Sequence, residues 1–334
     1  MTGALPPLEK PRFTSTHIVR WMAAQQNWDK IHFDQWFCDH VAKVKAPVIN
    51  GALKQHWIMQ FLNQGIPGGW PWRVDYQFVG QDHVNDKLRL EGDVSNVREF
   101  GGRIFVSVGV EIVNTDRDEV TMRGSAVVVL NASGEPMLDA LDIEPPDGMR
   151  LPLNANPPDP KTPAHINARL NTNVGRKKSC YPVDLSRLRL FADAVMGLPP
   201  LHYEPAAGAV SVWGAVVAPP LFSLHGLEAM PDSLPLGEDP TAQGREGVNE
   251  VGRDLGTLFD ISPAGGMNAG NRVEVHSLLK AGETIHADST LVGAKLRSGK
   301  RGGEMIFLET LNRYTEARGR ALVTERQTIV IRLV

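Results

Sequence analysis

Cysteine is nearly absent from this sequence, which has only Cys38 and Cys180 among 334 residues. Two cysteines cannot build a disulfide framework, so the composition favours a reducing compartment. An excess of one charge is also lacking, because 35 basic residues face 38 acidic ones. The formal net charge of −3 argues against a protein that coats nucleic acid or an anionic membrane. No apolar run approaches the roughly 20 residues of a membrane-spanning helix.

Signals for targeting, metals and phosphates are missing as well. The first ten residues lack the basic region and apolar core of a secretory signal, so we expect a cytoplasmic protein without membrane or nucleic-acid partners. Cys-x-x-Cys and His-Glu-x-x-His spacings do not occur, and Cys38-Asp-His40 stands alone, so no metal is predicted. The segment Gly265–Gly270 precedes a strand pattern, not a helix, and is therefore predicted to be a loop.

Glycine and proline, in contrast, are abundant, with 32 and 24 residues. Prolines concentrate between Pro145 and Pro163, where neither a helix nor a central strand can run. We interpret this segment as an extended linker; the alternative is a long surface loop inside one domain.

The part before the linker begins with helical patterns. Ser15 or Thr16 is the expected N-cap of a first helix, and the apolar positions from Leu53 to Leu62 form one face of a second. Period-two alternation then predicts strands, with Gly101-Gly102 as a hairpin turn between two of them. The expected strands cover residues 72–78, 87–94, 103–113 and 121–130.

The same order recurs after the linker. Trp21 and His32 are eleven positions apart, as are Phe191 and His202, and Ala46-Pro47 parallels Ala218-Pro219. Two diverged copies of one α+β unit explain this better than chance resemblance. The expected elements are a helix near 188–195, an apolar segment 221–230, strands at 272–277, 284–292, 304–314 and 322–333, and a Gly/Pro-rich flap or insertion at 231–271.

One loop gathers the groups for acid–base chemistry. Asn27, Asp29, His32 and Asp34 lie within eight residues directly after the first helix. A carboxylate near an imidazole is the minimum for general acid–base catalysis, since each group tunes the proton affinity of the other. The alternative is an ordinary polar surface loop.

This loop resembles that of the MaoC-like hydratases, the (R)-specific enoyl-CoA hydratases, which read roughly Gly-Asp-x-Asn-Pro-(Ile/Leu)-His. Residues 26–34 stand in that register, and residues 46–55 resemble the start of the family's central helix, with Gly51 at the family's glycine. Residues 190–204 and 217–222 make the second half similar to the N-terminal half of a fatty-synthase-type dehydratase. The resemblance implies an α+β double hot-dog fold: a hot-dog domain at 1–135, a linker at 136–164 and a degenerate hot-dog domain at 165–334.

The chain departs from the family pattern at the acid. Asn27 stands where the family has its catalytic acidic residue, and Asp29 stands where the family has asparagine. Either Asp29 supplies the acid, or Asn27 only positions water beside His32, or this loop does not catalyse. In the second half Gly197 takes the acid's place. That half is therefore predicted to be non-catalytic and to hold the acyl chain.

The implied activity is reversible hydration of a trans-2-enoyl-CoA, with His32, Asp29 and Asn27 as catalytic residues. Asn50 and Gly51 would bind the thioester carbonyl, and no cofactor is expected beyond the coenzyme A of the substrate. By analogy the protein would be a homodimer. The alternatives are a hot-dog acyl-CoA thioesterase and a non-catalytic acyl-CoA-binding subunit of a heteromeric hydratase.

Basic residues near hairpin turns are candidates for the coenzyme A phosphates, although such residues are often merely solvated. They are Arg98, Arg103, Lys295, Arg297, Lys300 and Arg301. The sequence does not name the acyl group. A Trp-rich segment at residues 69–72, together with the second half, suggests a large or ring-bearing chain.

Overall fold

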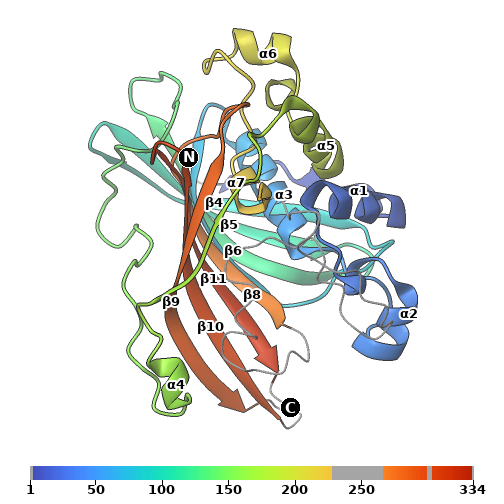
Figure 1. The fold of residues 1–334 in the computed structure, drawn as a ribbon. Coiled ribbons are helices and arrows are strands. Elements are labelled where there is room, and N and C mark those ends of the chain that lie inside the picture. Colours follow the sequence, from blue (N-terminus) through green and yellow to red (C-terminus); the bar gives the residue numbers. More distant parts are fainter. Residues whose placement is uncertain (1–2, 228–265, 299–302, 333–334) are drawn as a thin grey trace.

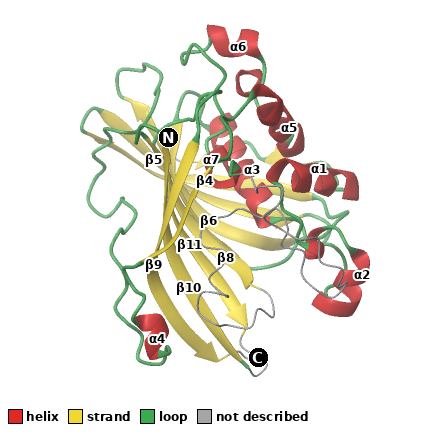
Figure 2. Cartoon of the chain, in the orientation of Figure 1, coloured by secondary structure: helices red, strands yellow, loops and turns green. Residues whose placement is uncertain are grey.

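A single antiparallel sheet of eleven strands organises the molecule (Figure 1). The computed structural model describes residues 3–227, 266–298 and 303–332. The strands follow the order β1-β4-β5-β6-β3-β8-β11-β10-β9-β7, with β2 also paired to β4. Figure 2 shows α1, α3, α5 and α7 on one face of this sheet. No helix among the described residues is both long enough and apolar enough to cross a membrane.

The first unit has the two helices and four long strands that the sequence predicts. They are α1 (Ser15–Gln25), α3 (Gly51–Gly65), β3 (Trp70–Phe78), β4 (Leu88–Phe100), β5 (Arg103–Asn114) and β6 (Glu119–Asn131). Gly101 and Gly102 turn between β4 and β5 with φ of 56° and 71°, a conformation that glycine adopts without strain. The N-cap of α1 is Thr14, so the prediction of Ser15 or Thr16 is wrong. His17 decides the position, because its Nδ1 lies 3.0 Å from both the Thr14 backbone nitrogen and the Thr14 hydroxyl.

Periodicity does not predict the short elements, because each spans too few residues to show a period. In the first half they are β1 (Gly3–Ala4), β2 (Leu8–Glu9), η1 (Lys30–His32), α2 (Gln35–Phe37) and η2 (Cys38–Ala42). In the second half they are α4 (Ala164–Asn167), β7 (Asn173–Lys178), η3 (Pro200–His202) and α6 (Pro205–Val210).

The second unit repeats the helix and the four long strands. They are α5 (Leu185–Val195), β8 (Gly266–Val275), β9 (Ile285–Ser298), β10 (Glu304–Glu316) and β11 (Ala321–Arg332). The apolar segment 221–230 begins with the short helix α7 (Phe222–His225), and its last residues lie outside the described part. Most of the predicted flap at 231–271 lies outside it too.

The prediction of a loop at Gly265–Gly270 is wrong from residue 266 onward, because β8 already begins there. Gly270 pairs with Gln77 on β3 and with Thr328 on β11. A Cβ at Gly270 would lie 2.5 Å from the carbonyl oxygen of Tyr76. This glycine therefore permits a close approach of two strands and does not mark a loop.

The two units join through the sheet and through packed helices. In the sheet β3 pairs with β8, so that Val74 lies opposite Val273. Above it, Trp21 of α1 meets Phe191 of α5 with ring centroids 5.3 Å apart, and both are buried. One continuous apolar core runs across this junction. Such burial is the main source of folding free energy, so the units stabilise each other.

The proline-rich connection runs along the face of the sheet opposite to these helices. Arg326, buried on β11, donates to the carbonyl oxygens of Pro152 at 2.9 Å and Asn154 at 3.0 Å. Leu151 is buried against Val292 and Leu311. Residues 151–154 are thus fastened to the second unit, although proline keeps them out of helix and strand. The division at 135 and 164 stays a prediction.

Candidate active site

His32 is held in one tautomer at the end of η1. Its Nδ1 donates to the carbonyl oxygen of Val48 at 2.8 Å, which leaves Nε2 as an acceptor for the Asn50 Nδ2 amide at 3.1 Å. Burial lowers the pKa of His32 to about 4; the hydrogen bond to Val48 opposes this shift, and the charge of Lys54 adds to it. The imidazole is therefore neutral near pH 7 and presents a basic nitrogen.

Asn50 connects this imidazole to the start of α3. It is the N-cap, and its Oδ1 accepts the Ala52 N–H at 2.8 Å while its Nδ2 reaches His32. Within the described part of the chain no acceptor is bonded to the Gly51 N–H. That amide, at the positive end of the helix dipole, is suited to a developing negative charge.

Gly51 also has a packing reason to be glycine. A Cβ at this position would lie 2.8 Å from Cζ of Phe78. The absence of a side chain therefore lets the Phe78 ring cover the first turn of α3. The proposed binding of the thioester carbonyl at Gly51 remains a prediction beside this packing role.

Asn27 and Asp29 are linked to His32 through hydrogen bonds of the backbone. Asn27 and Asp29 are buried, with 2% and 3% of their surface exposed. The Asn27 Oδ1 accepts the Asp29 N–H at 3.1 Å, and the Asp29 carbonyl accepts the His32 N–H at 3.0 Å. Asp34 instead caps α2, since its Oδ1 accepts the Phe37 N–H at 3.0 Å. The structure thus gathers Asn27, Asp29 and His32 in one turn and assigns Asp34 to capping.

A buried ion pair fixes the segment that carries Asn50, and sequence reasoning missed it. Lys54 Nζ lies 2.6 Å from Asp82 Oδ2, and both side chains are almost fully buried. Asp82 also accepts from Asn114 at 2.9 Å and Thr121 at 2.7 Å, and its carbonyl accepts the Ile49 N–H at 2.7 Å. The one signal in the sequence is Lys54 itself, a lysine among the buried residues of an apolar helix.

Comparison with known proteins now bears on this geometry. The model of the FAS1-like dehydratase domain region matches residues 172–325. A protein assigned as a MaoC-domain dehydratase from Chloroflexus aurantiacus superposes with a TM-score of 0.66 at 13% identity, over 100% of this chain and 95% of its own. A Mycobacterium tuberculosis protein described as having a double hot-dog fold gives 0.59 at 11%, over 98% of this chain and 96% of its own. No curated protein sequence matches.

A third structure is larger. Full-length peroxisomal multifunctional enzyme type 2 from Drosophila melanogaster gives a TM-score of 0.54 at 12% identity, and the match covers 98% of this chain but 48% of that one.

The chain has the double hot-dog fold. This confirms the predicted fold and its similarity to the fold of MaoC-like dehydratases. Within the second unit, residues 172–325 are similar to the FAS1-like dehydratase domain region.

The second unit of the double hot dog keeps the scaffold of the site without its polar partners. His202 Nδ1 donates to the Val217 carbonyl at 2.8 Å, as His32 does to Val48. Gly197, with φ of 82°, stands where Asn27 stands in the first unit. Burial lowers the pKa of His202 to about 4, so this histidine is neutral too. A structural role for His202 stays our prediction.

Binding of coenzyme A phosphates by the arginines of β4 and β5 stays a prediction. Arg98 lies near the end of β4. It stacks on Phe100, and Arg103 contacts Met137.

On the second unit's hairpin, Arg297 pairs with Asp159 at 3.6 Å, and Lys295 lies on β9. Lys300 and Arg301 lie outside the described residues. The Trp-rich segment is core: Trp70 and Trp72 are buried in β3, and Trp72 meets Phe105 edge-on. These tryptophans therefore give no support to a large or ring-bearing acyl chain.

Proposed function

We propose that this chain is a hydro-lyase that adds water reversibly to a trans-2-enoyl-CoA to give a 3-hydroxyacyl-CoA. The observation that carries the proposal is the neutral His32, whose Nε2 lies beside Asn50 at the N-terminus of the central helix. A double hot-dog fold shared with MaoC-like dehydratases supports it.

In the proposed reaction the thioester carbonyl accepts a hydrogen bond from the Gly51 N–H. When the Asn50 amide turns from Nε2 to the incoming water or substrate, His32 Nε2 takes a proton from water as the water oxygen bonds to the β-carbon. The electrons of the double bond then move onto the α-carbon and the carbonyl oxygen. A proton then bonds to the α-carbon, and the carbonyl re-forms. The net change is the addition of one water, and the reverse sequence is dehydration.

We assign the α-carbon proton to Asp29. It is buried in the same turn as His32, and its backbone carbonyl accepts the His32 N–H at 3.0 Å. Asp34, which is nearer in sequence, is occupied as the cap of α2. Asn27, which holds the Asp29 backbone N–H, would be a positioning residue.

The test follows the enoyl absorbance of crotonyl-CoA and of longer trans-2-enoyl-CoA thioesters with the purified full chain. We expect wild-type turnover and a loss of at least about 100-fold in His32→Ala. His202→Ala is the matched control, because this histidine makes the same hydrogen bond in the second unit. It should retain hydration, provided that thermal unfolding shows it folded. Hydration unchanged by His32→Ala would refute the site.

The same reactions separate the two alternative functions. A thiol reagent detects free coenzyme A, which a thioesterase releases and a hydratase does not. Thermal stabilisation by acyl-CoA without turnover of any thioester would indicate the binding subunit.

A further inference from the structure

The inner face of the second unit's sheet, toward α3 and α7, carries polar side chains. Residues paired across antiparallel strands point to the same face. One row joins Asn271 on β8 to Gln327 on β11 and Thr310 on β10, and the next joins Glu325 on β11 to Asn312 on β10. All five are buried.

The corresponding face of the first unit is apolar. There the row Val74, Ala126 and Val108 is buried against the core that includes Leu53 of α3. A hot-dog sheet therefore needs no polar side chains to pack on a helix in this protein. Buried polar groups cost free energy unless they are hydrogen-bonded. The polar face of the second unit therefore needs an explanation other than packing against a helix.

Part of this face is internally paired around a carboxyl group. Ser289 Oγ donates to Asn312 Oδ1 at 2.7 Å, and Asn312 Nδ2 donates to Glu325 at 3.0 Å. Asn271 Nδ2 donates to the other oxygen of Glu325, and Tyr314 also hydrogen-bonds to it. Burial raises the pKa of Glu325 to about 7, although these hydrogen bonds oppose the shift.

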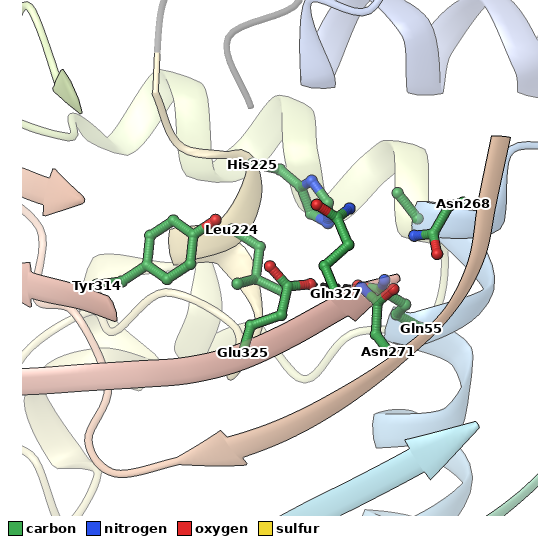
Figure 3. Close-up of a pocket in the computed structure, with 9 residues that line it drawn as sticks. Gln55, Leu224, His225, Asn268, Asn271, Tyr314, Glu325 and Gln327 are labelled. Atoms are coloured by element: carbon green, nitrogen blue, oxygen red, sulfur yellow. Dashed lines mark hydrogen bonds between the residues drawn. The ribbon is translucent and has the colours of Figure 1, made fainter. Parts of the chain in front are cut away.

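A pocket lies between this face and the first turns of α3 (Figure 3). Ala52, whose N–H is bonded to Asn50, lines it, so the pocket adjoins the proposed thioester site. The described residues that line it are Ala52, Gln55, Leu224, His225, Asn268, Asn271, Tyr314, Glu325 and Gln327. None of these is lysine or arginine, and burial lowers the pKa of His225 to about 3, so the lining offers no cation.

Two acceptors in the lining are unsatisfied. The Gln55 Oε1 and Asn271 Oδ1 atoms are buried and have no hydrogen-bond partner among the described residues. Their side chains come from α3 and β8, and both line the pocket (Figure 3). A buried acceptor without a donor destabilises the fold, and a ligand that donates a hydrogen bond would remove that cost.

We propose that this pocket is the acyl subsite of the hydratase and that it selects an acyl chain ending in a hydroxyl group. The proposal rests on the proposed function. A hydroxyl can donate its one proton to one of the two unsatisfied amide oxygens, whereas an alkyl end can donate to neither. A carboxylate end only accepts hydrogen bonds, and it meets neither a cation nor a free donor pair at these two atoms.

The dimensions of the pocket admit only the end of an acyl chain. The cavity has a volume of about 10 Å³, which is room for one water-sized group such as a terminal hydroxyl. Gly51 and Gln55 are four residues apart on α3, a rise of ~6 Å. An extended acyl chain of four to five carbons covers that span when its carbonyl lies at the Gly51 N–H.

The experiment measures equilibrium binding of three saturated thioesters that the enzyme cannot hydrate: pentanoyl-CoA, 5-hydroxypentanoyl-CoA and glutaryl-CoA. They differ only in a terminal methyl, hydroxymethyl or carboxylate group. In the wild-type chain we expect the hydroxylated thioester to bind at least about tenfold more tightly than the other two. Equal or weaker binding of the hydroxylated thioester, or no binding of any of the three, would overturn the proposal.

Variants then locate the preference. Gln55→Leu and, from the opposite wall, Asn271→Leu each remove one of the unsatisfied oxygens. These variants should bind pentanoyl-CoA and 5-hydroxypentanoyl-CoA with more nearly equal affinity than the wild type. Gln64→Leu is the matched control, an exposed glutamine on the same helix, and should keep the preference. A preference unchanged in both pocket variants would refute the subsite. Because binding needs no turnover, hydration of crotonyl-CoA without a hydroxyl preference refutes the subsite alone. A preference without hydration refutes the proposed function alone.

Discussion

His32 works as a base only while Nε2 carries no proton. Its surroundings keep Nε2 unprotonated to a lower pH than in an exposed histidine. Since the pKa of His32 is lowered to about 4, its basic form persists well below the ordinary range of histidine. We predict that kcat/KM for hydration shows no loss from His32 protonation between pH 8 and 5.5 and falls as pH drops through about 4. A fall centred near pH 6.5 would contradict a desolvated His32.

The charge of Lys54 contributes to the lowered pKa of His32, so removing Lys54 gives a second test of that pKa. Replacing both members of the ion pair, as Lys54→Met with Asp82→Leu, removes a positive charge near His32 and leaves no unpaired partner. The acidic limb of the pH profile should move upward in pH, because the imidazolium form loses a repelling charge. An unmoved limb would show that burial alone sets the pKa.

The exchanged Asn27 and Asp29 yield a residue-scale prediction about the acid. Asp29→Asn should lower kcat by about 100-fold with little change in KM, because the amide cannot deliver a proton. Asn27→Asp keeps an oxygen for the Asp29 N–H and should leave kcat within a few-fold. If Asp29→Asn kept full activity while Asn27→Asp raised it, the acid would belong at position 27.

At the scale of elements, α3 is positioned by its own lysine. The Lys54–Asp82 pair is buried, so loss of one partner leaves an uncompensated charge or unpaired polar atoms. We predict that Asp82→Leu lowers the free energy of unfolding by about 3–5 kcal/mol, measured by urea denaturation. The double variant with Lys54→Met should recover much of this loss. Equal losses in the single and double variants would mean that Asp82 acts chiefly through Asn114 and Thr121.

The elements also show what the sequence could predict. Long strands and α1, α3 and α5 follow from periodicity because each spans several periods. The Lys54–Asp82 pair joins residues 28 positions apart, and the junction of β3 with β8 joins residues about 200 apart. No local pattern specifies such contacts. His32 could be found because the family motif is local, whereas Gln55, Asn271 and Glu325 meet only in the folded chain.

At the scale of the whole molecule, repetition was the strongest signal. The spacing from Trp21 to His32 and from Phe191 to His202 predicted equivalent units, and both histidines donate to a carbonyl at 2.8 Å. Divergence is harder to read. The first unit has Asn50 beside its histidine, and the second unit has the polar sheet face. Comparing the two repeats therefore does not predict either feature, because each occurs in one unit.

Buried histidines make the whole fold sensitive to acid. Burial is the largest cause that lowers the pKa of six of them: His32, His56, His83, His202, His225 and His276. In the unfolded chain they bind protons below about pH 6.5. In the folded chain the pKa falls to about 4 for His32, His202 and His276 and to about 3 for His225. Their contribution to stability is therefore complete above pH 6.5 and is lost as pH falls toward 4.

We predict that the free energy of unfolding is several kcal/mol lower at pH 5 than at pH 7, since each such histidine changes it by up to about 1.4 kcal/mol per pH unit. Asp75, Glu274 and Glu325 act in the opposite direction, because burial raises their pKa values and so favours the folded state in acid. They are three groups against six. Urea denaturation at both pH values measures the difference. His225→Phe should reduce the dependence by about one proton, because a phenyl ring binds no proton in either state. Stability that is equal or greater at pH 5 would mean that these histidines become protonated in the folded chain.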